Sequence, residues 1–184
     1  MSYSTLLKNT AMCFILFLGI IVTAPLTVQP IPAFDYRPID VKQLSCLAAN
    51  IFYEASGESV LGQAAVARVV LNRVAYGFAN TPCGVIYQTT TILKADTETG
   101  EEIPVKVCQF SWVCAEKSPP SRNNPGYKQA EQIALEVLSR DAYRDVVPKN
   151  TLFFHNALVD PLWPYKQVAA IGNHIFYSKD KRVK

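Results

Sequence analysis

Two neighbouring stretches with a helical spacing of apolar residues, 41–55 and 60–75, constrain the fold of this chain most strongly. The apolar residues on one face of the first stretch are Leu44, Leu47, Ala48, Ile51 and Phe52, and those of the second are Val66, Val69, Val70 and Val74. Between them, Gly57 can take the left-handed conformation that ends a helix, and Ser59 can cap the next helix. The spacing therefore predicts two helices joined by a short turn.

The rest of the chain mixes helical and strand-like patterns. Thr81-Pro82 predicts the start of a short helix that reaches Tyr87, and residues 127–139 resume helical spacing. Residues 92–107 alternate as a solvent-facing β-hairpin does, and 151–154 and 171–177 have the pattern of strands, with a Pro-rich link over 161–164. Together they predict a mostly helical α+β domain with a small antiparallel sheet.

Composition bounds the size and the partners. The chain has 184 residues, 49% of them hydrophobic, which suits one compact domain rather than two. The formal net charge is only +3, which argues against a bulk electrostatic interaction with nucleic acid. We expect no nucleic-acid partner, and a monomer.

The N-terminus has the pattern of an export signal. Residues 11–26 carry no charge and follow Lys8. This stretch is shorter than the about 20 residues of a comfortable membrane span, so a cleaved signal peptide and a retained anchor in the cytoplasmic membrane both stay open. We expect residues 1–26 to be that segment, 27–38 a Pro-rich linker, 39–178 the folded domain and 179–184 a basic tail. Either interpretation places the domain outside the cytoplasm, in the periplasm or the extracellular space.

Four cysteines follow the apolar segment that holds Cys13; they are Cys46, Cys83, Cys108 and Cys114. An even number in an exported domain predicts two disulfides, and three pairings are open. A zinc site is the alternative, but no two cysteines have Cys-x-x-Cys spacing and both histidines, His155 and His174, are distant in sequence. We expect no metal ion and no cofactor.

Glu54 is the candidate acid. It falls in the last turn of the first predicted helix, where the negative end of the helix dipole opposes ionisation by about 0.3–1 kcal/mol. Its neighbours Phe52, Tyr53 and Ala55 favour a partly desolvated site, which raises a carboxyl pKa. Such an acid can protonate the leaving oxygen of a glycosidic bond. The spacing alone fits an ordinary surface glutamate equally well.

Several motifs in a fixed order carry a family resemblance. They are Tyr53-Glu-Ala-Ser-Gly-Glu58, Gly62-Gln-Ala-Ala-Val-Ala67, Leu71-Asn-Arg-Val74, Val85-Ile-Tyr-Gln88, Gln109-Phe-Ser111 and Ile171-Gly-Asn-His-Ile-Phe-Tyr177. With them, residues 44–178 resemble the cell-wall hydrolase family of spore cortex-lytic enzymes. Two departures are Ser56, where the family often has arginine, and residues 89–107, which look like an insertion.

The resemblance implies a lysozyme-like fold and a lytic transglycosylase whose single acid/base is Glu54, in a catalytic domain over 39–178. Such enzymes cut the β-1,4 bond between N-acetylmuramic acid and N-acetylglucosamine in peptidoglycan glycan strands and leave 1,6-anhydromuramic ends. We expect six residues to contact the substrate: Tyr53, Gln63, Gln109, Phe110, Ser111 and Tyr177. Packing roles for Tyr53 and Tyr177 are equally compatible with the sequence.

Other readings of these residues stay open. Glu58 is the candidate second carboxylate of a hydrolytic muramidase, although we interpret it as a structural acid in the first turn of the second helix. A non-catalytic wall-binding module is a further alternative, and both histidines are interpreted as structural. A zinc amidase lacks its ligands here, and a cysteine peptidase would need a free thiol. The sequence suits a phage endolysin and a bacterial remodelling enzyme alike.

Overall fold

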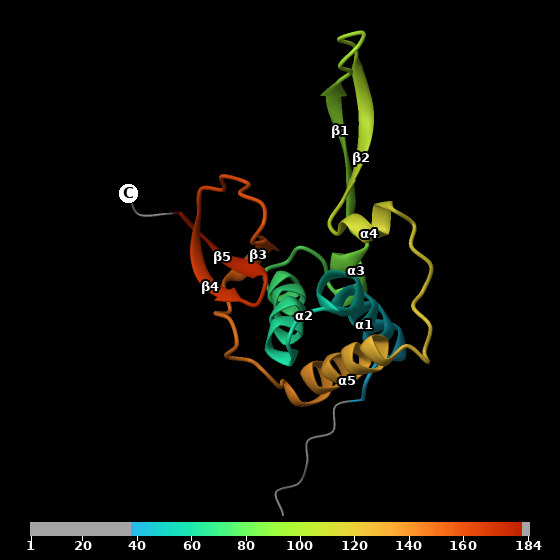
Figure 1. The fold of residues 1–184 in the computed structure, drawn as a ribbon, viewed down its shortest axis with the longest axis vertical. Coiled ribbons are helices and arrows are strands. Elements are labelled where there is room, and N and C mark those ends of the chain that lie inside the picture. Colours follow the sequence, from blue (N-terminus) through green and yellow to red (C-terminus); the bar gives the residue numbers. More distant parts are fainter. Residues whose placement is uncertain (1–37, 182–184) are drawn as a thin grey trace, which may run out of the picture. The chain divides into compact units, whose positions relative to one another are not determined.

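The computed structural model describes residues 38–181, in which five helices and five strands form two sheets and a helical bundle (Figure 1). The helices are α1 (Val41–Ala55), α2 (Val60–Ala75), α3 (Pro82–Ile86), α4 (Ser111–Cys114) and α5 (Pro125–Arg140). The strands are β1 (Thr89–Ala95), β2 (Glu102–Cys108), β3 (Thr151–Asn156), β4 (Tyr165–Ile171) and β5 (His174–Lys181). The expected α+β class with a small antiparallel sheet is confirmed. The expected signal or anchor segment and the linker to residue 37 lie outside the described residues.

Side-chain caps begin α1 and α2 where the sequence predicts, whereas Asn124 caps α5 at Pro125, two residues before the predicted start. Asp40 accepts a hydrogen bond from the Lys42 N–H (2.8 Å), and Ser59 accepts one from the Gly62 N–H (3.3 Å). The end of α1 differs from the expectation, because Gly57 does not adopt a left-handed conformation. Instead Ser56 continues in right-handed helical geometry and donates its N–H to the Phe52 carbonyl, so the turn into α2 needs no glycine of positive φ.

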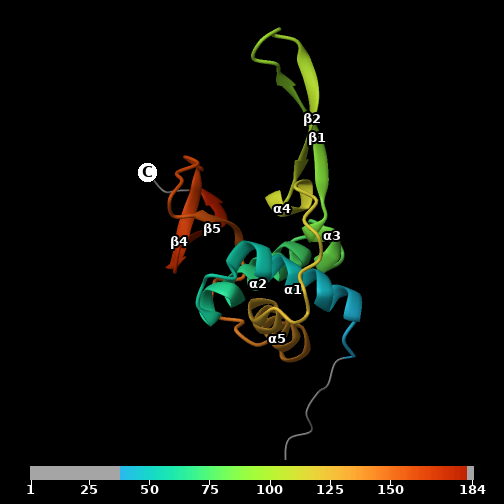
Figure 2. The same ribbon diagram turned by 45° about the vertical axis from the view of Figure 1, so that its right-hand side comes forward.

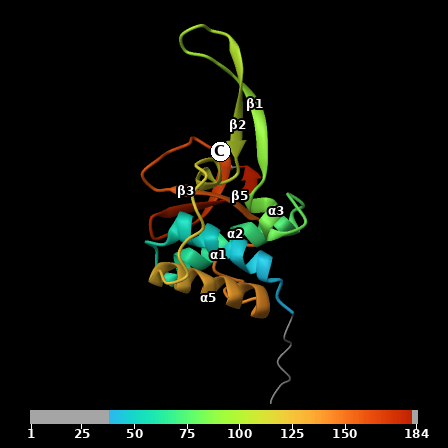
Figure 3. The same cartoon turned by 90° about the vertical axis from the view of Figure 1, so that its right-hand side faces the viewer.

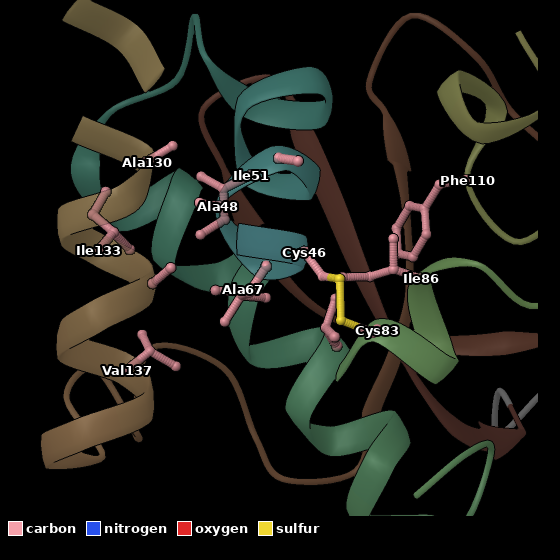
Figure 4. Close-up of a cluster of buried hydrophobic side chains, with 14 of the residues drawn as sticks. Cys46, Ala48, Ile51, Ala67, Cys83, Ile86, Phe110, Ala130, Ile133 and Val137 are labelled. Carbon is pink, nitrogen blue, oxygen red and sulfur yellow. A yellow bond between two sulfur atoms is a disulfide. The ribbon is translucent and has the colours of Figure 1, made fainter. Parts of the chain in front are cut away.

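Helix α2 is the central element, and it is buried on two sides. One side joins α1, α3 and α5 around a cluster that includes Ile51, Ala67 and Ile86 (Figure 4). The other side contributes Val66 and Val69 to a second cluster that packs against Phe176 of β5. A helix that is apolar on more than one face is stable only when it is covered in this way.

A disulfide ties the helical cluster together. Cys46 of α1 and Cys83 of α3 are bonded, and the bond lies beside the buried side chains (Figure 4). The second disulfide joins Cys108, at the end of β2, to Cys114 of α4. Both expected disulfides are confirmed, and the structure selects this pairing among the three that the sequence left open.

The C-terminal sheet has the order β3-β5-β4, with all pairs antiparallel. The prediction of one strand over 171–177 is wrong, because Gly172 (φ 58°) and Asn173 form a tight turn between β4 and β5. The Gly-Asn pair is a turn signal that the surrounding apolar residues obscured. Strand β5 continues to Lys181, so the residues 179–181 that were expected in the basic tail extend the sheet.

The predicted hairpin is confirmed as β1 and β2, which extend away from the helices (Figures 2 and 3). All seven residues of β1 are exposed, so this ribbon packs on little besides itself. Short helix α4, which sequence reasoning missed, closes its base. Within residues 38–181, no helix combines the length and apolar character needed to cross a membrane.

Candidate active site

Glu54 lies half-buried in the last turn of α1, as predicted. Its carboxyl group makes no hydrogen bond or ion pair with any of the described residues. A carboxyl without internal partners, held on a rigid helix, is free to exchange a proton with a bound molecule.

Burial has the largest effect on the pKa of the Glu54 carboxyl. It raises the pKa of this carboxyl above its ordinary value, while the positive charges of Arg73 and Lys117 act in the opposite direction. The direction agrees with the sequence expectation of a desolvated acid. Both charged groups that act on Glu54 are cations, so they stabilise the carboxylate once it has given up its proton.

Arg73, near the end of α2, is a buried cation that sequence reasoning missed. Its Nε–H donates to the Leu152 carbonyl (2.7 Å), and its guanidinium lies over the Phe110 ring at 5.3 Å and the Phe78 ring at 5.9 Å. Burial lowers the pKa of Arg73 to about 10, and the charge of Glu54 opposes that shift. Arg73 therefore stays charged at neutral pH. Its place in the Leu-Asn-Arg-Val motif was the available signal.

An aromatic groove adjoins the end of α1, and its wall includes Tyr53, the residue before Glu54. This cavity of about 370 Å³ is lined by the rings of Tyr53, Tyr87, Trp112 and Tyr127, by Lys42, Lys117, Pro119 and Pro120, and by Ser45, Cys46 and Ala49. The Tyr53 and Trp112 rings stack at 4.8 Å, and the Trp112 Nε1–H donates to Asn50 Oδ1 at 3.0 Å. Stacked, hydrogen-bonded rings of this kind form a rigid wall.

Lys117 connects the aromatic groove to the acid. Its ammonium lies over the Tyr53 ring at 5.2 Å, and the same charge acts on Glu54. The Tyr53 hydroxyl donates to the Ser118 carbonyl, which fixes the segment after Lys117 against α1.

A second pocket, of about 450 Å³, lies at the base of the β1–β2 hairpin. Gln109, one of the expected substrate residues, lines it together with Gln88, Phe78 and hairpin residues. Ser111 is exposed at the start of α4. The disulfide between Cys108 and Cys114 encloses these two residues and holds their loop.

The other three expected substrate residues are buried and have partners inside the protein. The Gln63 Nε2–H donates to the Glu58 carbonyl (3.0 Å), while Phe110, only 4% exposed, packs on Arg73 and Phe154. Tyr177 is 4% exposed, and its hydroxyl lies 2.8 Å from Nε2 of His155. In this structure their contacts are those of packing groups that support the site.

Glu58, the candidate second carboxylate, is hydrogen-bonded to the β4–β5 turn. Its oxygens accept hydrogen bonds from the Asn173 backbone N–H (3.1 and 3.2 Å) and side-chain amide (3.1 Å). Gly172 makes room for it, since a Cβ there would lie 1.7 Å from Glu58 Oε2. These contacts give the structural interpretation of Glu58 a physical basis. The role differs from the predicted one, because the carboxylate binds the β4–β5 turn and does not act as a first-turn acid of α2.

His174 faces Glu58, with 3.7 Å between Nδ1 and Oε1. Burial lowers the pKa of His174 more than the nearby carboxylate raises it, so the pair is not a charged ion pair at neutral pH. In the part of the chain that the structure describes, no group of three or more His, Cys, Asp or Glu side chains is arranged to hold a metal ion.

Comparison with known protein families identifies the family of this chain. A family model described as cell wall hydrolase matches residues 57–177, about two thirds of the chain. The chain belongs to the cell wall hydrolase family. It is thus an enzyme that degrades peptidoglycan. The matched range begins after Glu54 and therefore does not include it. The proposed role of Glu54 is argued from the burial of its carboxyl and from the nearby charges.

Two solved structures show the same fold as this cell wall hydrolase. The catalytic domain of the Bacillus cereus SleB protein is 23% identical, with a TM-score of 0.51 over 82% of this chain and 100% of that chain. The catalytic domain of a germination-specific lytic transglycosylase, SleB from Bacillus anthracis, is 24% identical, with a TM-score of 0.50 over 77% of this chain and 98% of that chain. At such identities the likeness establishes the fold. No curated protein sequence matches the chain.

Proposed function

We propose that this cell wall hydrolase cleaves the β-1,4 bond between N-acetylmuramic acid and N-acetylglucosamine as a lytic transglycosylase, with Glu54 as its only acid/base. The observation that carries the proposal is the state of the Glu54 carboxyl: half-buried, without a hydrogen-bond or ion-pair partner among residues 38–181, and with a raised pKa. A similar solved structure is that of a lytic transglycosylase, which supports the same reaction.

The proposed reaction needs one proton carrier. The protonated Glu54 gives its proton to the glycosidic oxygen, and the bond from that oxygen to the anomeric carbon of the muramic acid breaks. The C6 hydroxyl of the same sugar then bonds to the anomeric carbon, and its proton returns to Glu54. No water is consumed, and the product is a 1,6-anhydromuramic end. The nearby charges of Arg73 and Lys117 stabilise the carboxylate between the two proton transfers.

Hydrolysis by two carboxylates is the alternative, and the position of Glu58 argues against it. Hydrolytic glycosidases place a second carboxylate across the scissile bond, where it activates water or attacks the sugar. The Glu58 carboxylate instead accepts hydrogen bonds from Asn173 and lies in a space that Gly172 leaves free.

Substrate contacts are proposed for three of the residues singled out from the sequence. Tyr53 lines the aromatic groove, Gln109 lines the pocket at the hairpin base, and Ser111 is exposed in the disulfide-closed loop. Residues 1–26 are proposed to direct export, which agrees with the two disulfides, since such bonds persist in oxidising compartments.

The test is the release of soluble fragments from purified sacculi by Glu54→Gln. The substitution keeps the shape of the side chain and removes its proton, so we expect the rate to fall about 10²–10⁴-fold. Glu98→Gln, at the exposed tip of the hairpin, is the matched control and should retain the wild-type rate. A Glu54→Gln enzyme as active as the wild type would overturn the assignment.

A further inference from the structure

The aromatic groove is positively charged as well as apolar. Its lining includes two lysines, Lys42 and Lys117, and no aspartate or glutamate. Outside the lining, Asp40 caps α1, and Glu131 and Arg122 act on Tyr127 with opposite effects. A groove with cations at its rim and rings in its wall fits a ligand that carries both carboxylates and small apolar groups.

In a peptidoglycan strand that description fits the stem peptide better than the sugars. The N-acetylated rings of the backbone are uncharged. Each muramic acid carries a lactyl group, from which a short peptide extends with free carboxylates and alanine methyl groups. The peptide is therefore the acidic, partly apolar component closest to the bond that is cut.

The position of the groove matches the position of that peptide. Tyr53, in the groove wall, directly precedes Glu54 on α1, and Lys117 contacts the Tyr53 ring while its charge reaches Glu54. A muramic acid whose glycosidic oxygen lies at Glu54 would have its lactyl substituent within reach of the groove.

We propose that the aromatic groove binds the acidic stem peptide of the muramic acid at the cleavage site, with Lys42 and Lys117 pairing its carboxylates. The enzyme then selects peptide-bearing strands over bare glycan. This inference rests on the proposed function, because it takes Glu54 as the point at which the bond is cut.

Lys42 is the residue with which to test the proposal, because it lies in the groove but does not act on Glu54. The test variant is Lys42→Glu. A glutamate in the first turn of α1 is favourable for the helix dipole, so the fold should be retained. Lys166→Glu makes the same charge change on β4, at an exposed position outside the groove lining, and is the matched control.

The chain contains only two tryptophans, and one of them lines the groove, which gives a direct readout of binding. In the full chain carrying Trp163→Phe and Glu54→Gln, the fluorescence of Trp112 reports on the groove while turnover is suppressed. The titrants are soluble glycan oligomers with their stem peptides, and the same oligomers after an amidase has removed the peptides, which leaves only the lactyl carboxylates.

We expect the peptide-bearing oligomers to bind at least about tenfold more tightly, which corresponds to one or two carboxylate–ammonium pairs. Lys42→Glu should abolish most of that difference, and Lys166→Glu should leave it intact. Equal affinity for the two oligomers, or an equal loss for both in Lys42→Glu, would overturn the proposal. Failure of the proposed function is seen separately, as an unmodified enzyme that releases no fragments from sacculi.

Discussion

At the scale of single residues, the proposed chemistry depends on the balance of effects at Glu54. Burial raises the pKa of the carboxyl, and two cations partly offset that rise. The folded protein thus holds an acid that stays protonated to a higher pH than a free glutamate and whose conjugate base is stabilised nearby. Arg73 is buried and held by the Leu152 carbonyl, whereas Lys117 is exposed and can be changed without disturbing the core.

The pH dependence of Lys117→Met tests this balance. Because the positive charge of Lys117 lowers the pKa of Glu54, its removal should raise that pKa further. Since protonated Glu54 is the active form in the proposed mechanism, the alkaline limb of the pH–rate profile should move to higher pH. Lys117 is exposed, so the difference from wild type should shrink in high salt. The control, Lys166→Met, should leave the profile in place; a shift of the alkaline limb to lower pH in Lys117→Met would contradict the account.

At the scale of elements, the β4–β5 turn is locked to the start of α2 by one carboxylate. Glu58 accepts three hydrogen bonds from Asn173, and the turn can approach it because Gly172 has no side chain. This contact attaches the C-terminal sheet to the segment that carries Glu54.

Substitution of Gly172 measures that attachment. Gly172→Ala should lower the free energy of unfolding by about 3–5 kcal/mol, from the cost of a left-handed alanine and the loss of hydrogen bonds to a charged group. The control is Gly100→Ala, where φ is also positive (73°) but a Cβ would meet no atom within 4 Å. Denaturant unfolding of both variants separates the two terms. An equal loss in Gly172→Ala and Gly100→Ala would mean that the Glu58 contact adds nothing.

The two disulfides should differ in their contribution to stability. Cys46–Cys83 closes a separation of 37 residues and Cys108–Cys114 one of 6. Loop-closure entropy then predicts losses of about 4 and about 2 kcal/mol when each pair is replaced by alanine. Thermal unfolding of the two double variants checks the order. A larger loss for Cys108 and Cys114 would show that the short loop stabilises more than chain entropy explains.

Local signals in the sequence predicted the starts of α2 and α3, but not helix α4. Ser59 and Thr81 are capping residues whose effect is local, and in the structure Asp40 caps α1 in the same way. Strand β4 was missed because the sequence around 165–171 has no clear alternation, and its pairing with β5 is set by the Gly172-Asn173 turn. Tertiary pairing, rather than propensity, decides that strand.

The candidate site divides in the same way. Glu54 could be selected from its motif and its position at a helix end. The aromatic groove could not, because Tyr53, Tyr87, Trp112 and Tyr127 come from separate elements and meet only in the folded chain. Only the structure shows that Gln109 faces a pocket while its neighbour Phe110 is buried. The sequence alone does not distinguish the two environments.

At the scale of the whole molecule, helices α1 and α2 hold the candidate acid and its buried cation. Helix α1, helix α4 and the loop after α4 supply most of the groove, and the C-terminal sheet supports both long helices through Phe176 and Glu58. The proposed transglycosylation uses this arrangement with Glu54 as its one proton carrier: the muramyl group passes to its own C6 hydroxyl, and no second carboxylate is needed to activate water.

The products of digestion distinguish transglycosylation from hydrolysis. Purified peptidoglycan is digested in ¹⁸O-labelled water, and the released muropeptides are analysed by mass spectrometry. The account predicts 1,6-anhydromuramic ends, lighter by one water than hydrolytic ends and free of the label, formed by the wild type and lost in Glu54→Gln. Reducing muramic acid ends that carry ¹⁸O would contradict it.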